Sequence, residues 1–152
     1  DSLGLLWEAE SRMLCRGVKL EGDATDEALP TTAHVSELTR WRAPADIGRR
    51  YARVSGDYNP IHLSALTAKL FGFPQAIAHG LWNKAHTLAA LGEHLPAANI
   101  EIAVEFRKPV RLPSEVRLLA SAAGSSGELR LRGAGDIEHM VGTWQTKKKK
   151  TA

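Results

Sequence analysis

The sequence is short of cysteine and of long apolar runs, and each shortage excludes a class of protein. Cys15 is the only cysteine among 152 residues, so the chain forms no internal disulfide and offers no cysteine-based metal site. A single cysteine fits a reducing compartment, and we expect a cytoplasmic location. No apolar run approaches the roughly 20 residues that a membrane-spanning helix needs, and no secretory signal is visible. We therefore expect no insertion into a membrane.

Patterns typical of nucleotide and metal binding are missing as well. No glycine-rich loop of the phosphate-cradling kind follows a strand-like segment. Of the six histidines, His79 and His86 are seven positions apart, and we interpret this pair as unrelated to metal. We expect no metal and no other cofactor.

The positive charge is concentrated at one end. The formal net charge is +3, but residues 147–150 are four lysines, and without them the formal net charge is −1. The basic character is therefore a property of the tail, residues 147–152, and not of a nucleic-acid-binding face. We expect no nucleic-acid partner.

A chain of this length suffices for one domain with a core. Residues 5–16 alternate with period two, which predicts a strand. Residues 17–32 contain Gly, Asp, Glu, Thr and Pro without a pattern, which is typical of a linker or long loop. We divide the chain into an N-terminal strand and linker (1–37), a main domain (38–146) and the basic tail (147–152).

The main domain is predicted to contain a helix-rich part followed by strands. Residues 39–42 are expected to form a short strand and residues 44–54 a helix, with Ile47, Tyr51 and Val54 facing the core. A buried helix is expected over 81–91, where Leu81, Ala85 and Leu88 share a face. The other expected elements are a short helix over 64–70 and strands over 100–106, 115–123, 129–132 and 139–146.

One stretch, residues 51–62, carries a carboxylate and an imidazole that can act together. Asp57 and His62 are five positions apart, with Gly56 before them and Asn59-Pro60 between them. Asn-Pro favours a turn, so both side chains are expected to leave one bend. Such a pair can hold a water molecule and move its protons. The alternative is an ordinary Asx turn, with His62 simply hydrogen-bonded inside the fold.

This stretch resembles the signature of the R-specific enoyl-CoA hydratases, the MaoC-like or hydratase 2 family. The resemblance covers residues 41–118, and its motifs agree in order and spacing. The matching residues are Tyr51, Val54, Ser55, Gly56-Asp57-Tyr58-Asn59-Pro60, Ile61, His62 and Ala68, then Phe71-Gly72-Phe73-Pro74, Ala78-His79-Gly80 and Phe106-Arg107-Lys108-Pro109-Val110.

The resemblance implies an α+β hotdog fold, an antiparallel β-sheet wrapped around a central α-helix. Residues 1–37 depart from a single compact hotdog of this family, which leaves two interpretations. They are the closing strand and linker of a preceding hotdog repeat, or an extra N-terminal strand on a single hotdog. In either case an exposed sheet edge needs a partner, and we expect a homodimer or pseudo-dimer.

The resemblance also implies an activity, the reversible addition of water to trans-2-enoyl thioesters to give (3R)-3-hydroxyacyl thioesters. Asp57 and His62 are expected to be the acid–base pair, with the assignment of acid and base left open. The backbone amide of Gly80 is expected to stabilise the thioester oxygen, because an amide at a helix start is unpaired and lies at the positive end of the helix dipole.

Five further residues are candidates for substrate binding. Asn59 is expected either to shape the bend or to hold a catalytic partner, and Trp82 and Asn83 either to border the acyl pocket or to pack in the core. Arg107 and Lys108 are expected to contact CoA phosphates, with exposed strand-end charges as the alternative. His79 is expected to be structural, with its ring bonded to backbone.

Two other functions are consistent with the sequence. The same site can dehydrate (3R)-hydroxyacyl groups on acyl carrier protein in fatty-acid or polyketide synthesis. The chain can also be a non-catalytic acyl-CoA-binding hotdog subunit. The intact set of Asp57, His62 and Gly80 argues against the latter, because a binding module need not keep an acid–base pair.

Overall fold

The protein is built on one antiparallel sheet, as shown by a computed structural model that describes residues 6–12, 29 and 32–147. The five strands lie in the order β1-β3-β4-β5-β2, so that β1 and β2 form the two edges. All neighbouring strands are antiparallel. The strands are β1 (Ser36–Ala43), β2 (Ile100–Phe106), β3 (Ser114–Ala120), β4 (Ser126–Arg132) and β5 (Glu138–Thr146).

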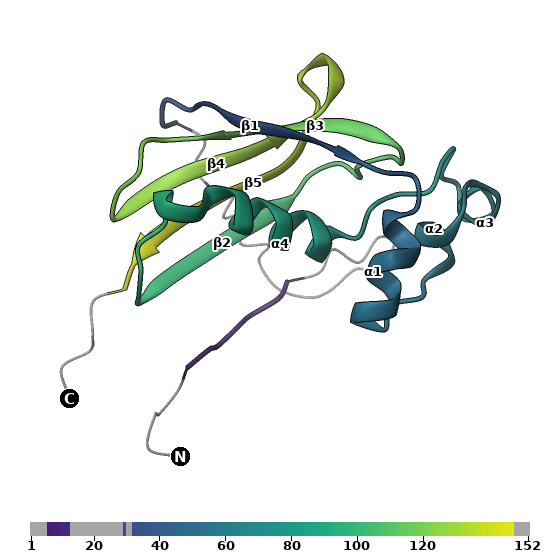
Figure 1. Cartoon of the computed structure of the whole chain (residues 1–152), viewed down its shortest axis with the longest axis horizontal. Helices are drawn as coiled ribbons and strands as arrows, with labels where there is room; N and C mark the ends of the chain where they lie inside the picture. The colour runs from purple at the N-terminus through teal and green to yellow at the C-terminus, as the bar shows by residue number, and fades with distance from the viewer. Residues whose placement is uncertain (1–5, 13–28, 30–31, 148–152) are drawn as a thin grey trace, which may run out of the picture.

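One helix lies along a face of this sheet, and three short helices gather beside it. Figure 1 shows α4 (Gly80–Leu91) in front of the strands, with the short helices together at one end of the sheet. The short helices are α1 (Ile47–Ser55), α2 (Pro60–Leu63) and α3 (Ala65–Leu70), and two 3-10 turns, Gly92–His94 and Ala134–Asp136, complete the set. This is the expected α+β hotdog arrangement.

The core lies between α4 and the inner face of the sheet. Period-two alternation brings Leu129 and Leu131 of β4 inside, at 1% and 0% exposure. Leu118 of β3 and Trp144 of β5 belong to the same buried cluster. The strands predicted over 100–106, 129–132 and 139–146 are therefore confirmed, with ends that shift by a few residues.

Helix α4 has the predicted position but a different buried face. Leu81, predicted to be inside, is 62% exposed. The buried residues are Asn83, Thr87 and Leu91, one turn apart in succession. Of the predicted face, Leu88 packs partly buried against the core, whereas Leu81 and Ala85 are exposed, so the prediction is confirmed for Leu88 alone.

The helix predicted over 44–54 begins later, and its last apolar residue is outside. It starts at Ile47 and ends at Ser55. Ile47 is buried, but Val54 is 85% exposed. The C-terminal turn of α1 extends past the end of the sheet, so Val54 has no core to pack against (Figure 1). The short helix α2 was not predicted at all.

The strand predicted over residues 5–16 is wrong where the structure describes it. Residues 6–12 form no strand, and residues 5 and 13–16 lie outside the described residues. Leu6 and Trp7 are 77% and 80% exposed. A period-two pattern forms a strand only when a neighbouring strand accepts its backbone hydrogen bonds, and residues 6–12 pair with none of the described strands.

Both ends of the main domain are tied to the sheet. The amides of Thr32 and Ala33 donate to Glu128 Oε1 at 3.1 and 2.9 Å, so the last residues of the predicted linker contact β4. Lys147 Nζ lies 3.5 Å from Glu101 Oε1. Residues 148–152 of the predicted tail lie outside the described residues. Among the described helices, none has the length and apolar character needed to cross a membrane.

Candidate active site

A short loop between α1 and α2 brings Asp57 close to His62. Helix α1 stops at Gly56, whose left-handed φ of 75° favours glycine. Asp57 Oδ1 then accepts from the amide of Asn59 at 3.1 Å, which closes an Asx turn. Asn59 Oδ1 accepts in turn from the amide of Ile61 at 3.3 Å and caps α2, the helix that carries His62.

His62 is held inside the protein in one tautomer. Its ring is 8% exposed, and Nδ1 lies 2.8 Å from the carbonyl oxygen of Ile77. A carbonyl oxygen can only accept, so Nδ1 carries the hydrogen and Nε2 keeps its lone pair. Burial lowers the pKa of His62 below its usual value, opposed by the Ile77 carbonyl and Asp57 and assisted by His79. His62 is therefore a neutral imidazole with a free basic nitrogen.

The segment 76–79 packs against the ring of His62. The amide of Ile77 donates to the Ile61 carbonyl at 3.1 Å, and the amide of Ala78 donates to the Val110 carbonyl at 2.8 Å. These bonds hold the segment between α2 and the chain before β3. They place the ring of His79 against that of His62, with 3.7 Å between centroids and 25° between planes.

His79 connects this stack to Asp57. Its ring is 3% exposed, and Nε2 lies 3.0 Å from the carbonyl oxygen of Asp57 and 3.8 Å from Oδ2 of the same residue. The expected bond from the His79 ring to backbone is thus present. One ligand-type atom from each of Asp57, His62 and His79 lies within 4.8 Å of the others. The Asp57 side chain is 55% exposed, so water reaches the cluster.

Among the residues that the structure describes, these three form the group of ligand-type side chains close enough together to hold a metal ion. However, His79 Nε2 faces a carbonyl oxygen and so carries a hydrogen, which occupies the nitrogen nearest to Asp57. The two rings are also stacked nearly face to face, so their in-plane lone pairs do not converge on one point. The arrangement fits a hydrogen-bonded acid–base cluster better than a metal site.

Gly80, the first residue of α4, directly follows His79. Its amide has no acceptor within the helix, as holds for the first amides of any helix. A Cβ at this position lies 3.2 to 3.3 Å from three ring atoms of Phe106, so the ring of Phe106 covers one side of Gly80. This contact joins the end of β2 to the start of α4.

The remaining predicted residues divide between the interior and the surface. Trp82 packs partly buried against the core, and Asn83 is buried, with an Oδ1 that finds no partner in the described part of the chain. Arg107 is exposed and pairs with Glu105 at 2.9 Å, as expected of a strand-end charge. Lys108 is exposed too, and its carbonyl accepts from His139 Nδ1 at 3.0 Å.

Sequence reasoning missed two supports of His62. The Ile77 carbonyl fixes its tautomer, and Gly48 of α1 packs against its backbone, where a Cβ would lie 1.9 Å from the His62 carbonyl oxygen. Neither has a sequence signal, because the first is a backbone group and the second is one glycine within a helix.

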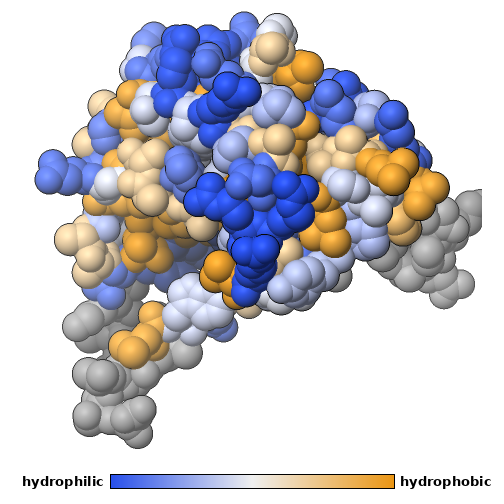
Figure 2. Space-filling model, turned by 45° about the vertical axis from the view of Figure 1, so that its right-hand side comes forward, coloured by the Kyte–Doolittle hydropathy of each residue, from blue (hydrophilic) through white to orange (hydrophobic). Residues whose placement is uncertain are grey.

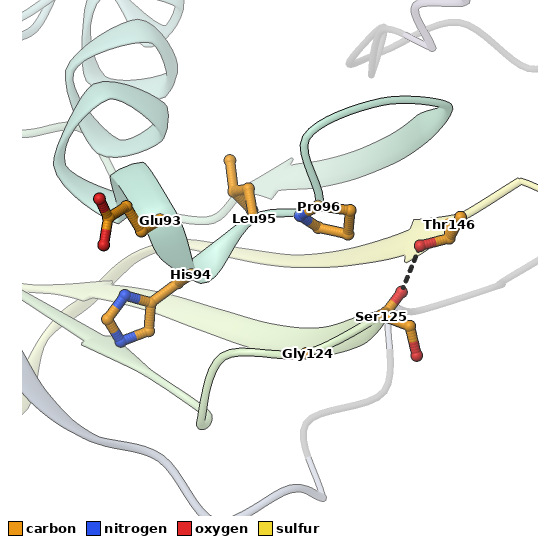
Figure 3. Close-up of a pocket in the computed structure, with 7 residues that line it drawn as sticks. All are labelled: Glu93, His94, Leu95, Pro96, Gly124, Ser125 and Thr146. Carbon is orange, nitrogen blue, oxygen red and sulfur yellow. Dashed lines mark hydrogen bonds between the residues drawn. The ribbon is translucent and has the colours of Figure 1, made fainter.

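A hollow of about 300 Å³ lies elsewhere, beyond the C-terminal end of α4 (Figure 3). It is lined by residues 93–96, 124–125 and 146, and Thr146 Oγ1 donates to the Ser125 carbonyl at 3.2 Å across it. Another hollow, of about 640 Å³, is lined by residues of β4 and β5 together with residues 33–34 and 121–122. Each is lined by one acidic residue and one histidine, Glu93 with His94 and Glu128 with His34, but neither contains a residue predicted for the site. We therefore place the candidate site at Asp57 and His62.

The chain matches the family described as MaoC like domain over residues 24–139. It is 42% identical over 116 residues to the 3-hydroxyacyl-thioester dehydratase X of Mycobacterium tuberculosis, covering 76% of this chain and 39% of that protein. It is 40% identical over 76 residues to the 3-hydroxybutyryl-CoA dehydratase of Methylorubrum extorquens, covering 48% of each. The chain thus spans less than half the length of these two relatives.

Solved structures support the same fold. The crystal structure of HtdX from Mycobacterium tuberculosis superposes with a TM-score of 0.67 at 37% identity, covering 73% of this chain and 48% of that one. The R-hydratase PhaJ1 of Pseudomonas aeruginosa gives a TM-score of 0.61 at 22% identity, covering 75% and 81%. At that identity the second likeness shows the fold alone.

The contact between Gly48 and His62 gives a first prediction. Gly48→Ala places a methyl group 1.9 Å from the His62 carbonyl oxygen, so α1 and α2 must move apart. We expect a loss of about 1–3 kcal/mol in the free energy of unfolding, measured by chemical denaturation. The matched control is Gly124→Ala, whose methyl group meets only the Ser126 carbonyl at 3.7 Å. Equal stability of the two variants would contradict this packing.

Proposed function

We propose, because this chain belongs to the MaoC-like domain family, that its Asp57–His62 site adds water reversibly to a trans-2-enoyl thioester and gives the (3R)-3-hydroxyacyl thioester. The observation that carries the proposal is the cluster of Asp57, His62 and His79, with atoms within 4.8 Å of one another and open to solvent on the Asp57 side. A carboxylate and a neutral imidazole at this separation can bind a single water molecule between them.

His62 is the better candidate for the base. Its Nδ1 hydrogen is committed to the Ile77 carbonyl, which leaves the Nε2 lone pair to accept a proton from water. The hydroxide oxygen bonds to C3 of the enoyl group while the proton passes to His62. Asp57 orients the water through its second hydrogen. The proton then returns from this pair to C2, so that H and OH have been added across the double bond.

The negative charge that builds on the thioester oxygen needs a donor, and we assign this role to the amide of Gly80. It lies at the positive end of the α4 dipole and follows His79 directly in the chain. The Phe106 ring beside Gly80 gives the thioester an apolar wall.

We assign secondary roles to the other candidates. Asn59 acts on the reaction through its cap on α2, which sets the position of His62. Trp82 and Asn83, in the first turn of α4, border the acyl group. Lys108 is the stronger candidate for a CoA phosphate, because Arg107 is already paired with Glu105.

The assay that tests the proposal follows the loss of enoyl absorbance of trans-2-enoyl thioesters over several chain lengths, with chiral analysis of the product. We expect Asp57→Asn to lower kcat by about 100-fold or more with unchanged thermal unfolding. His62→Ala is expected to lower kcat at least as much, and also to lower the unfolding midpoint because it removes the buried bond to Ile77. Wild-type rates in either folded variant would overturn the proposal. Matched CoA and carrier-protein thioesters then show which carrier is used, and binding without turnover would favour the non-catalytic alternative.

The low pKa of His62 sets the expected pH dependence. A base acts only when unprotonated, so kcat/KM falls as the pH drops through the pKa of His62 in the free enzyme. Because burial lowers that pKa, the acid limb is expected below the ordinary histidine value of about 6.5. A pH profile of kcat/KM measures the limb directly. A midpoint at or above the ordinary value would contradict His62 as the base.

We also propose that a second hotdog unit, from another copy or from a preceding repeat, covers the outer edge of β2. In the described part of the chain β2 pairs with β5 only, so its other edge is open. Phe106 and Leu81 are 48% and 62% exposed. Figure 2 shows hydrophobic groups scattered among hydrophilic ones on one face of the molecule. We expect a dimeric mass for this chain by light scattering at micromolar concentration, and a monomer would overturn the homodimer.

A further inference from the structure

We propose that His79 is a positioning residue for the reaction, and that its Nε2–H bond to the Asp57 carbonyl keeps the Asp57 carboxylate within reach of His62. The inference rests on the proposed function for its kinetic consequences. Its structural content, the bond and the tautomer that the bond requires, can be measured without any turnover.

His79 contacts every part of the proposed site. Its ring stacks on His62 at 3.7 Å between centroids and lies 5.0 Å from the ring of Tyr51. Its Nε2 lies 3.0 Å from the carbonyl oxygen of Asp57 and 3.8 Å from Oδ2 of the Asp57 carboxylate. It is also the N-cap residue of α4, so its backbone leads directly into Gly80. The side chain of His79 thus connects the proposed acid and base, and its backbone connects them to Gly80.

Asp57 depends on this contact for its placement. Its other hydrogen bonds are local, from its own amide to Ser55 Oγ at 3.2 Å and from the Asn59 amide to Oδ1 at 3.1 Å. Within the described part of the chain, the bond from His79 is the hydrogen bond that ties Asp57 to a segment distant in sequence. A loop that is closed only locally keeps its shape, but it can swing relative to His62.

The other nitrogen of His79 argues that the residue is not there for stability alone. Nδ1 is buried and finds no hydrogen-bond partner in the described part of the chain. A buried polar atom without a partner reduces stability, and each such atom in a native structure calls for an explanation. Here the explanation is that Nε2 must be the protonated nitrogen, because it faces a carbonyl oxygen.

Three substitutions separate the hydrogen bond from the ring. His79→Gln places an amide N–H close to the position of Nε2. His79→Asn reaches only as far as Nδ1, and His79→Phe keeps a stacking ring but removes the donor. We expect His79→Gln to keep kcat within about threefold of wild type, and the Asn and Phe variants to lose about 10- to 100-fold, with KM little changed, because misplacement of a reacting group costs this much.

Thermal unfolding distinguishes positioning from a purely structural role. The Phe variant loses the bond to the Asp57 carbonyl but also removes a buried nitrogen that has no partner, and these two effects oppose each other. Its unfolding midpoint is therefore expected to stay close to that of wild type while its kcat falls. If kcat follows the unfolding midpoint across the three variants, the role is structural and the proposal is overturned. It is also overturned if Phe retains activity and Gln does not, since stacking is then what matters.

A measurement on the unreacted protein tests the bond itself. Long-range proton–nitrogen correlation spectra of the histidine rings assign tautomers, and we expect the Nε2–H form for His79 and the Nδ1–H form for His62. An Nδ1–H form of His79 overturns the positioning role even in an active enzyme. The expected tautomers in a wild-type protein that turns over no enoyl thioester would overturn the proposed function and leave the His79–Asp57 bond intact.

Discussion

The hydrogen bond from His62 Nδ1 to the Ile77 carbonyl is the interaction on which the candidate site depends. It determines which ring nitrogen is basic, and it anchors the loop that bears Asp57 to the segment that precedes α4. That segment is itself fixed from the other side, where Ala78 and Leu112 exchange backbone bonds with Val110 and Ala76 at 2.8 Å. The geometry of the candidate site therefore relies on backbone pairing between two short irregular segments, residues 76–78 and 110–112.

Packing around this bond leaves little freedom. Gly48 lets α1 approach the His62 carbonyl more closely than any side chain allows. At the start of α4, the Phe106 ring covers Gly80 and couples the position of the helix to the edge strand β2. The Gly48 contact excludes any side chain, whereas a Cβ at Gly80 would meet the Phe106 ring at 3.2 to 3.3 Å, which is tight but not forbidden. Rigid support of this kind is what preorganised acid–base groups require.

The local structure of the loop around Asp57 could be predicted from the sequence, but the tertiary packing of the helices could not. The Gly56 stop, the Asp57 turn and the Asn59 cap each involve residues within two or three positions, so their side chains specify the bend directly. The buried face of α4 was mispredicted because Asn83 and Thr87 are inside while Leu81 is outside, against their hydropathy. The prediction that Val54 faces the core was wrong for a related reason. The spacing of apolar residues along a helix shows which face is apolar, but it does not show how far the core extends.

Because the carboxylate of Asp57 is half-exposed, water can exchange directly between solvent and the candidate site. In the proposed reaction water is consumed or released, so the site does not need to exclude solvent. Under that proposal, solvent at the exposed side of Asp57 supplies the water in one direction and takes it up in the other. In the proposed reaction, the direction of net flux then follows from the relative amounts of unsaturated and hydroxylated thioester outside the protein.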